Sequence, residues 1–288
     1  GRCRLLVQSD RPQDILAAID AAAATGADLF IAHTTIDPET VAAIVAAQGV
    51  DAVLRDGVLA TQGEPASTGG GRIHMMTSGT TGQPKLAAHT LDSLLARAKR
   101  AAEGNASSSA RWLLTYQPSG FAGVQVQLTA AWTGSAVVSP GERTPVGFRT
   151  AATENAITHI SATPTFWRAF LMMIRPGEFA LQQATLGGEA ADQGILDRIR
   201  TTFPTARITH TYASTEAGVV YAVHDGREGF PVAWLDAPDR PVQLRVRDEL
   251  LQIRSPHAMR GYLNLEGQPL LEDGWLGTLD RVEIRGDR

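Results

Sequence analysis

Lysine and cysteine are both scarce in this sequence. Lys85 and Lys99 are the only lysines among the 26 basic residues, and Cys3 is the single cysteine of the 288 residues. One cysteine can neither close a disulfide within the chain nor build a cysteine-based metal cluster, which is typical of a protein from the reducing cytoplasm. We therefore expect a cytoplasmic protein.

Long apolar runs and an excess of charge of one sign are also missing. The apolar segments are alanine-rich and interrupted by charges, as at residues 15–24, and are shorter than the roughly 20 apolar residues of a membrane-spanning helix. The formal net charge is only -4, from 26 basic and 30 acidic residues mixed along the chain, so no basic stripe could bind nucleic acid. We expect no membrane span and no nucleic-acid partner.

Apolar periodicity, proline and glycine divide the first fifth of the chain into alternating strands and helices. Three short apolar runs predict strands at residues 5–7, 29–32 and 52–54. Between them, helical patterns begin at Pro12 and Pro38, because proline suits the first helical turn. The polar, glycine-rich residues 57–71 then predict a surface loop or linker.

The same alternation resumes after this segment. Strands are predicted at residues 73–77, 112–115, 136–138 and 207–211, and helices at 91–103, 121–132 and 164–174. From about residue 229 short alternating runs predict antiparallel β structure. We expect an α/β fold with two lobes of mostly parallel sheet and flanking helices (1–71 and 72–228), followed by a small antiparallel β subdomain (229–288).

The strongest functional signal is the string TSGTTGQPK, which runs from Thr77 to Lys85. Glycines let backbone amides approach phosphate oxygens, hydroxyls add hydrogen-bond donors, and the lysine adds a positive charge. The spacing differs from that of a Walker loop, whose lysine directly follows its last glycine, and the Rossmann string GxGxxG is absent. The loop is therefore suited to binding a polyphosphate, but its spacing excludes a P-loop kinase.

This string resembles the phosphate loop (S/T)SG(S/T)TGxPK of the superfamily that includes acyl-CoA synthetases, adenylation domains and luciferases. The resemblance implies that residues 72–228 form a nucleotide-binding lobe. It also implies that Lys85 is catalytic and that the loop binds ATP through Thr77, Ser78, Gly79, Thr80, Thr81 and Gly82.

Two further strings resemble motifs that follow in the same order in this superfamily. The turn Leu186-Gly187-Gly188-Glu189-Ala190 resembles the one whose backbone lies along the adenine. The string TYASTE resembles YGxTE, which implies nucleotide contacts from Thr211, Tyr212, Ala213 and Ser214, catalytic roles for Thr215 and Glu216, and Mg²⁺ binding by Glu216. Tyr212 would stack on adenine, and Ala213 replaces the usual glycine.

The last motif is GWLGTLD, from Gly274 to Asp280, which resembles GWxxTGD. The resemblance implies that Asp280 accepts hydrogen bonds from both ribose hydroxyls, although Leu279 replaces the usual glycine. The seven histidines show no metal-binding spacing, and we expect structural roles for them.

The substrate pocket is expected near Phe121, Ala122 and Gly187. Residues 116–123 correspond to a segment that borders the acyl pocket and thiol tunnel in relatives. Peptide-synthetase relatives place an aspartate there to pair with an α-ammonium group, whereas this chain has Ala122. Because a buried ammonium without a carboxylate is costly, we expect a plain carboxylic acid as the substrate.

Taken together, the motifs predict ATP- and Mg²⁺-dependent activation of a small carboxylic acid as acyl-adenylate, with release of pyrophosphate and transfer to coenzyme A. Two alternatives stay open: adenylation that feeds an acyl carrier protein, and a non-catalytic nucleotide-binding relative marked by Phe121, Ala213 and Leu279. Complete members of the superfamily continue into a smaller C-terminal domain that supplies a further lysine. We therefore expect this chain to be part of a large N-terminal domain, truncated at both ends, that binds nucleotide better than it adenylates.

Overall fold

The chain divides into two compact units. The computed structural model describes residues 3–62, 70–77, 84–103, 108–264 and 273–288. The first unit consists of Gly1–Ala96, Tyr116–Leu128 and Met259–Gln268, and the second of Arg97–Thr115, Thr129–Ala258 and Pro269–Arg288. Each unit is therefore assembled from segments that are distant in sequence.

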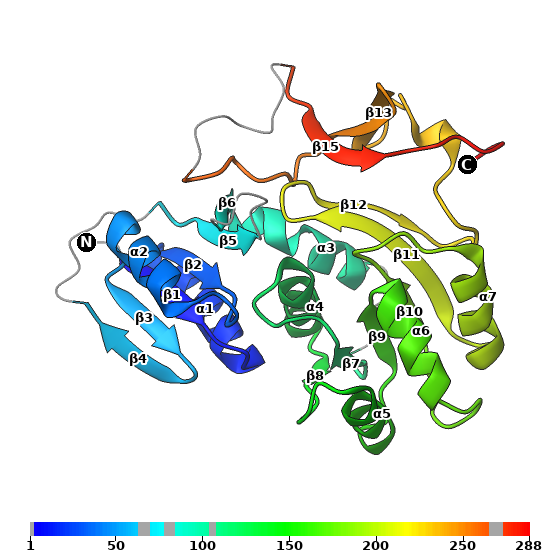
Figure 1. The fold of residues 1–288 in the computed structure, drawn as a ribbon, viewed down its shortest axis with the longest axis horizontal. Coiled ribbons are helices and arrows are strands. Elements are labelled where there is room, and N and C mark those ends of the chain that lie inside the picture. The colour runs from blue at the N-terminus through cyan, green and yellow to red at the C-terminus, as the bar shows by residue number, and fades with distance from the viewer. Residues whose placement is uncertain (1–2, 63–69, 78–83, 104–107, 265–272) are drawn as a thin grey trace. The chain divides into compact units, whose positions relative to one another are not determined.

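A six-stranded sheet with the order β4-β3-β1-β2-β5-β6 forms the centre of the first unit (Figure 1). Strands β3, β1, β2 and β5 are parallel, while β4 and β6 pair antiparallel at the two edges. The strands are β1 (Arg4–Gln8), β2 (Asp28–Ala32), β3 (Ala52–Arg55), β4 (Val58–Thr61), β5 (Ile73–Thr77) and β6 (Lys85–His89).

Helices α1 (Pro12–Thr25) and α2 (Pro38–Gln48) form the crossovers between the first three strands, as predicted. Pro12 and Pro38 occupy the first helical turn, and the Asp37 carboxylate caps α2 by accepting a hydrogen bond of 2.9 Å from the backbone N–H of Thr40. The core between α2 and the sheet includes Leu6 and Phe30.

The prediction that residues 57–71 form a loop or linker was wrong for residues 58–61, which form β4. Asp56 and Gly57 both have positive φ angles, 47° and 85°, as a two-residue hairpin turn requires. The Asp-Gly pair was therefore a hairpin signal, and it brings β4 back alongside β3. All four residues of β4 are exposed, which explains why they lack the alternation of a half-buried strand.

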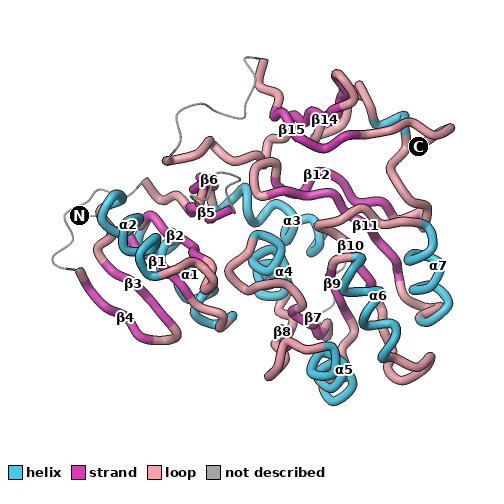
Figure 2. Tube along the Cα trace, in the orientation of Figure 1, coloured by secondary structure: helices cyan, strands magenta, loops and turns pink. Residues whose placement is uncertain are grey.

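A second six-stranded sheet, with the order β12-β11-β10-β9-β7-β8, forms the centre of the second unit. Five of its strands are parallel, and β12 pairs antiparallel with β11. Figure 2 shows these strands in magenta and the helices in cyan. The strands are β7 (Arg111–Leu114), β8 (Ala136–Val138), β9 (His159–Ala162), β10 (Gln183–Leu186), β11 (Arg207–Ser214) and β12 (Gly218–Val223).

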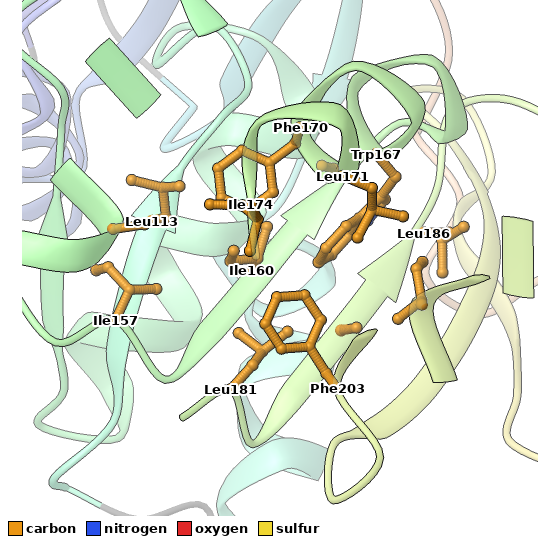
Figure 3. Packing of buried hydrophobic residues seen from close by; sticks show 14 of the residues in the cluster. Leu113, Ile157, Ile160, Trp167, Phe170, Leu171, Ile174, Leu181, Leu186 and Phe203 are labelled. Carbon is orange, nitrogen blue, oxygen red and sulfur yellow. The ribbon is translucent and has the colours of Figure 1, made fainter. Parts of the chain in front are cut away.

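Helices α5 (Pro145–Glu154), α6 (Pro164–Met173) and α7 (Gln193–Thr202) pack on this sheet and bury the main core of the second unit (Figure 3). Trp167 is fully buried in this core, and its indole N–H donates to the carbonyl oxygen of Thr185, 3.0 Å away. Thr163 caps α6, as its position before Pro164 indicates.

Two helices and a small sheet complete the described elements. Helices α3 (Leu91–Glu103) and α4 (Phe121–Trp132) are each divided between the two units. The short 3₁₀ helix η1 (Val232–Trp234) precedes an antiparallel sheet with the order β13-β14-β15, made of Gln243–Arg247, Leu250–Arg254 and Leu276–Arg281. The predicted fold class is therefore confirmed. Within the described residues, no helix has the length and apolar content needed to cross a membrane.

His74 on β5 is a buried histidine that titrates far below its ordinary range. Its side chain is 2% exposed and stacks on Phe30 with ring centroids 4.6 Å apart. Its Nδ1 atom has no hydrogen-bond partner among the described residues. Burial lowers the pKa of His74 to about 4, and the nearby Asp28 charge opposes this shift only in part.

Protonation should therefore destabilise the protein between about pH 6.5 and about pH 4, because in this range the unfolded chain binds the proton that the folded chain excludes. Replacing His74 by Phe removes this linkage. Lowering the pH from about 7 to 5 should cost the wild type about 2 kcal/mol more unfolding free energy than His74→Phe. Urea unfolding at both pH values measures the difference, and equal losses in the two proteins would contradict it.

Candidate functional site

A cavity of about 450 Å³ lies within the second unit. It is bordered by the turn after β10, the end of β11, strand β12 and the segment that contains the end of β15, which Figure 1 shows beside the β11–β12 hairpin. The predicted nucleotide-binding residues that line it are Gly188, Glu189, Ala190, Thr211, Tyr212, Ala213, Ser214 and Asp280. The structure thus brings together residues from three separate motifs, and we call this space the β11–β15 cavity.

Parallel pairing of β10 and β11 explains why two of these motifs meet. Leu186 and His210 are register partners at the ends of the paired region, so the residues that follow each of them emerge at the same sheet edge. The Thr211 hydroxyl donates to the carbonyl oxygen of Leu186 over 3.2 Å and ties the two strand ends together. Gly188 has a φ angle of +84°, which a glycine adopts without strain in this turn.

Glu189 connects this turn to the first turn of α6. Its carboxylate accepts hydrogen bonds from the backbone N–H of Thr165 at 3.0 Å and from the Thr165 hydroxyl at 2.6 Å. These bonds lower the pKa of Glu189, and a negative charge at a helix N-terminus is favourable. Glu189 therefore holds in place the turn whose residues Gly188 and Ala190 line the cavity.

Two tyrosines form an aromatic wall of the cavity. Tyr212 on β11 and Tyr221 on β12 are register partners, and their rings stack with centroids 5.5 Å apart and an interplanar angle of 20°. Phe230 adds a third ring, 4.8 Å from Tyr221. A half-buried aromatic surface of this kind can pack against a flat purine base.

Asp280 is an exposed carboxylate at the end of β15, and it accepts a hydrogen bond from the hydroxyl of Tyr212. Burial raises the pKa of Tyr212, and the hydrogen bond and charge of Asp280 raise it further. Burial and the Asp280 charge also raise the pKa of Tyr221. At neutral pH both phenols are therefore protonated, and Tyr212 acts as a donor.

Gly187, Thr215 and Glu216 do not line this cavity. Gly187 is buried at the end of β10, while Thr215 and Glu216 are half-buried in the turn between β11 and β12. The hydroxyl of Ser214 shapes this turn by accepting from the backbone N–H of Ala217, 3.0 Å away. The described residues contain no group of three or more His, Cys, Asp or Glu side chains that could hold a metal ion. A single carboxylate such as Glu216 suits Mg²⁺, which keeps most of its other positions for phosphates and water.

The remaining predicted residues belong to the first unit. Thr77 and Lys85 are register partners at the loop end of the β5–β6 hairpin, so they lie opposite each other at the two ends of the predicted phosphate loop. The loop residues Ser78, Gly79, Thr80, Thr81 and Gly82 lie outside the described residues.

The two predicted acyl-pocket residues on α4 also belong to the first unit. Phe121 and Ala122 begin α4. The Phe121 ring lies 6.0 Å from that of His89. Their assignment to a substrate pocket stays a prediction.

Sequence motifs missed several residues of the cavity, among them Tyr221, Phe230 and Arg288. The string GVVYAV has no polar alternation that would have singled out Tyr221, which reaches the cavity because β12 pairs with β11 and places it opposite Tyr212. Arg288 carries no local signal, because its role depends on distant groups: it forms an ion pair with Asp225 at 2.6 Å and donates to the carbonyl oxygen of Gly229 at 2.9 Å.

The link between Asp280 and the tyrosines can be tested by titration, since the chain has only four tyrosines. In Asp280→Asn the two raised pKa values should fall towards their ordinary value, because the carboxylate charge no longer opposes ionisation. Ultraviolet absorbance of tyrosinate, compared with Tyr212→Phe to assign the signal, measures the shift. Identical titration curves for Asp280→Asn and the wild type would contradict the contact.

Comparisons with known proteins identify a family. The AMP-binding enzyme family matches residues 72–263. The p-hydroxybenzoic acid–AMP ligase FadD22 of Mycobacterium tuberculosis is 28% identical over 231 residues, and that of Mycobacterium marinum is 30% identical over 234. Each match covers 73% of this chain and 32% of the relative, so the chain spans about a third of the length of these curated relatives.

Solved structures show the same fold at lower identity. The unliganded O-succinylbenzoate coenzyme A synthetase MenE from Bacillus subtilis has a TM-score of 0.73 at 16% identity, covering 97% of this chain and 66% of that one. VinN has a TM-score of 0.77 at 17% identity, covering 97% and 83%. The family match and the shared fold agree with the motifs, and the chain therefore belongs to the AMP-binding enzyme family of adenylate-forming ligases.

Proposed function

We propose that this chain binds ATP and takes part in the activation of a carboxylic acid as acyl-adenylate, with release of pyrophosphate and subsequent transfer to coenzyme A. The observation that carries this proposal is the convergence of Tyr212, Tyr221 and Asp280 in one cavity. An aromatic surface beside an exposed carboxylate offers complementary contacts to the base and sugar of a nucleoside.

The β11–β15 cavity would hold the AMP moiety. Its volume of about 450 Å³ is within the range of small-molecule sites. The adenine would pack against Tyr212 and the backbone of Gly188 and Ala190, while Asp280 would accept hydrogen bonds from the two ribose hydroxyls. Those hydroxyls would replace the Tyr212 hydroxyl that donates to Asp280 in this structure. The carboxylate would therefore still accept hydrogen bonds when nucleotide is bound.

The phosphates would be bound by the loop between β5 and β6. In this proposal Thr77, the loop residues 78–82 and Lys85 contact the β- and γ-phosphates, and Thr215 contacts the α-phosphate. Glu216 would hold Mg²⁺, which would neutralise phosphate charge. The contributions of these residues are positioning and electrostatic stabilisation, with no covalent enzyme intermediate.

The reaction would be an in-line displacement at the α-phosphorus. A carboxylate oxygen of the acid forms the new bond to phosphorus, and the bond from phosphorus to the bridging oxygen breaks, so that pyrophosphate leaves with the electron pair. Two anions must meet, so Lys85 would compensate charge on the leaving pyrophosphate. Phe121, Ala122 and Gly187 would border the acid.

The name of the curated relatives suggests an aromatic acid, and p-hydroxybenzoate is the first compound to test. Ala122 supports a plain acid over an α-amino acid, because it offers no carboxylate to an ammonium group. An acyl carrier protein is the alternative acceptor. Pyrophosphate exchange stimulated by p-hydroxybenzoate but not by tyrosine would support this choice of acid, and the reverse would overturn it.

Nucleotide binding separates the proposed roles of Asp280 and Lys85. Asp280→Asn should weaken AMP binding about tenfold, because charge-assisted hydrogen bonds to the ribose are lost, but should barely change the affinity for 2′,3′-dideoxy-AMP. Lys85→Ala should weaken ATP binding about tenfold and leave AMP binding unchanged, because AMP lacks the phosphates that Lys85 contacts. Calorimetric titration of each variant with each nucleotide measures these differences.

Asp239→Asn is the matched control, since Asp239 is an exposed carboxylate of the same unit outside the cavity. Its affinities should equal those of the wild type. If Asp280→Asn weakened AMP and its dideoxy analogue equally, Asp280 would not bind the ribose hydroxyls. If the folded wild type bound neither AMP nor ATP, the proposed function itself would be wrong for this chain.

A further inference from the structure

Residues 260–264 pair with β6, the strand that begins at Lys85. The backbone N–H of Arg260 donates to Ala88 O at 2.7 Å, the N–H of Ala88 donates to Gly261 O at 2.9 Å, and the N–H of Leu263 donates to Leu86 O at 2.9 Å. Ala87 and Tyr262 form an antiparallel bridge. All these residues belong to the first unit. This segment, which we call the β6 clamp, therefore pairs with the edge of β6 that faces away from β5.

The side-chain amide of Asn264 forms hydrogen bonds with the backbone on both sides of Lys85. Its Oδ1 accepts from the backbone N–H of Leu86 at 2.9 Å, and its Nδ2 donates to the carbonyl oxygen of Pro84 at 2.8 Å. The two bonded groups stand on either side of Lys85 in the chain, so the amide restrains the backbone that carries it. An asparagine provides this donor and acceptor together, which neither aspartate nor alanine can.

Tyr262 contacts the side chain of the same lysine. The Lys85 ammonium lies 5.3 Å from the centroid of the Tyr262 ring, within the range of a cation–π interaction. Both residues are half-buried. A free lysine side chain has many rotamers, and ordering it on binding costs free energy. A ring beside the ammonium reduces this cost before the nucleotide arrives.

We propose that Tyr262 and Asn264 are positioning residues that hold Lys85 ready for the phosphates of ATP. The inference rests on the proposed function, in which Lys85 contacts those phosphates. Tyr262 orients the charged end of the side chain, and Asn264 fixes the backbone at its base. Neither residue needs to touch the nucleotide, so their effect on binding passes through Lys85.

Coupling to Lys85 is the readout that a merely structural role would not produce. Tyr262→Leu should weaken binding of Mg·ATP about fivefold and leave AMP binding unchanged, whereas Tyr262→Phe, which keeps the ring, should restore most of the lost affinity. Introduced into Lys85→Ala, Tyr262→Leu should have no further effect. Asn264→Ala should follow the same pattern with a loss of about threefold to tenfold.

Two controls separate this coupling from general damage. Leu263→Ala removes an exposed side chain from the β6 clamp and retains its backbone bonds. Trp132→Leu removes the ring that lies 5.7 Å from the ammonium of Lys99, the other lysine of the chain. Both should keep the wild-type affinity for Mg·ATP, measured by calorimetry as for the test variants.

The outcomes separate the two proposals. If Lys85→Ala weakens ATP binding but Tyr262→Leu does not, or if their effects simply add, the positioning role is wrong and the proposed function stands. Loss of AMP binding in Tyr262→Leu or Asn264→Ala would show a structural role and also overturn the inference. If Lys85→Ala leaves ATP binding unchanged, the role of Lys85 in the proposed function is wrong, and the positioning role fails with it.

Discussion

Parallel pairing between β10 and β11 is the constraint on which the rest of the candidate site depends. The register of this pair places the residues after Leu186 and His210 at one sheet edge, although 24 positions separate them in sequence. Because each register step in a strand reverses the direction of the side chains, a slip by one residue would turn Tyr212 away from the cavity. The site therefore depends on the adjoining core, where the Trp167 indole on α6 donates a hydrogen bond to the carbonyl oxygen of Thr185 on β10.

The third motif reaches the cavity by a different route. Trp275 is buried on the small antiparallel sheet, with the guanidinium groups of Arg245 and Arg254 centred 4.2 Å and 4.8 Å from its ring. These cation–π contacts anchor the start of β15. The strand then continues through Leu279, which is 89% exposed, to Asp280. The departure from the family's glycine at position 279 is thus accommodated at the surface, and it does not displace the carboxylate from the cavity.

Sequence patterns predicted helices α1, α2, α3, α4 and α6 and the parallel character of the fold, because apolar periodicity and proline or glycine at helix ends are local signals. They missed helices α5 and α7 and strands β4, β6, β9, β10 and β12 as elements. Strands such as β10 are four residues long and buried at three of those positions, so they show no alternation of apolar and polar residues. Motifs singled out Tyr212 and Asp280, which line one cavity, and their roles in nucleotide binding stay predictions. Tyr221 and Arg288 were missed because their proximity depends on strand pairing and on contacts between distant residues.

The first unit is discontinuous in sequence, and this has a consequence for synthesis of the protein. Asn264 bonds Pro84 and Leu86 across 180 and 178 positions, and residues 129–258, which belong to the other unit, lie between. A ribosome synthesises the chain from the N-terminus to the C-terminus, so N-terminal residues emerge first. Strand β6, which carries Lys85, therefore leaves the ribosome early with one edge unpaired. The β6 clamp can pair with this edge only after most of the second unit has been translated. An exposed strand edge can pair with another chain and cause aggregation. The nascent chain is therefore most prone to aggregate between the synthesis of β6 and the synthesis of the β6 clamp.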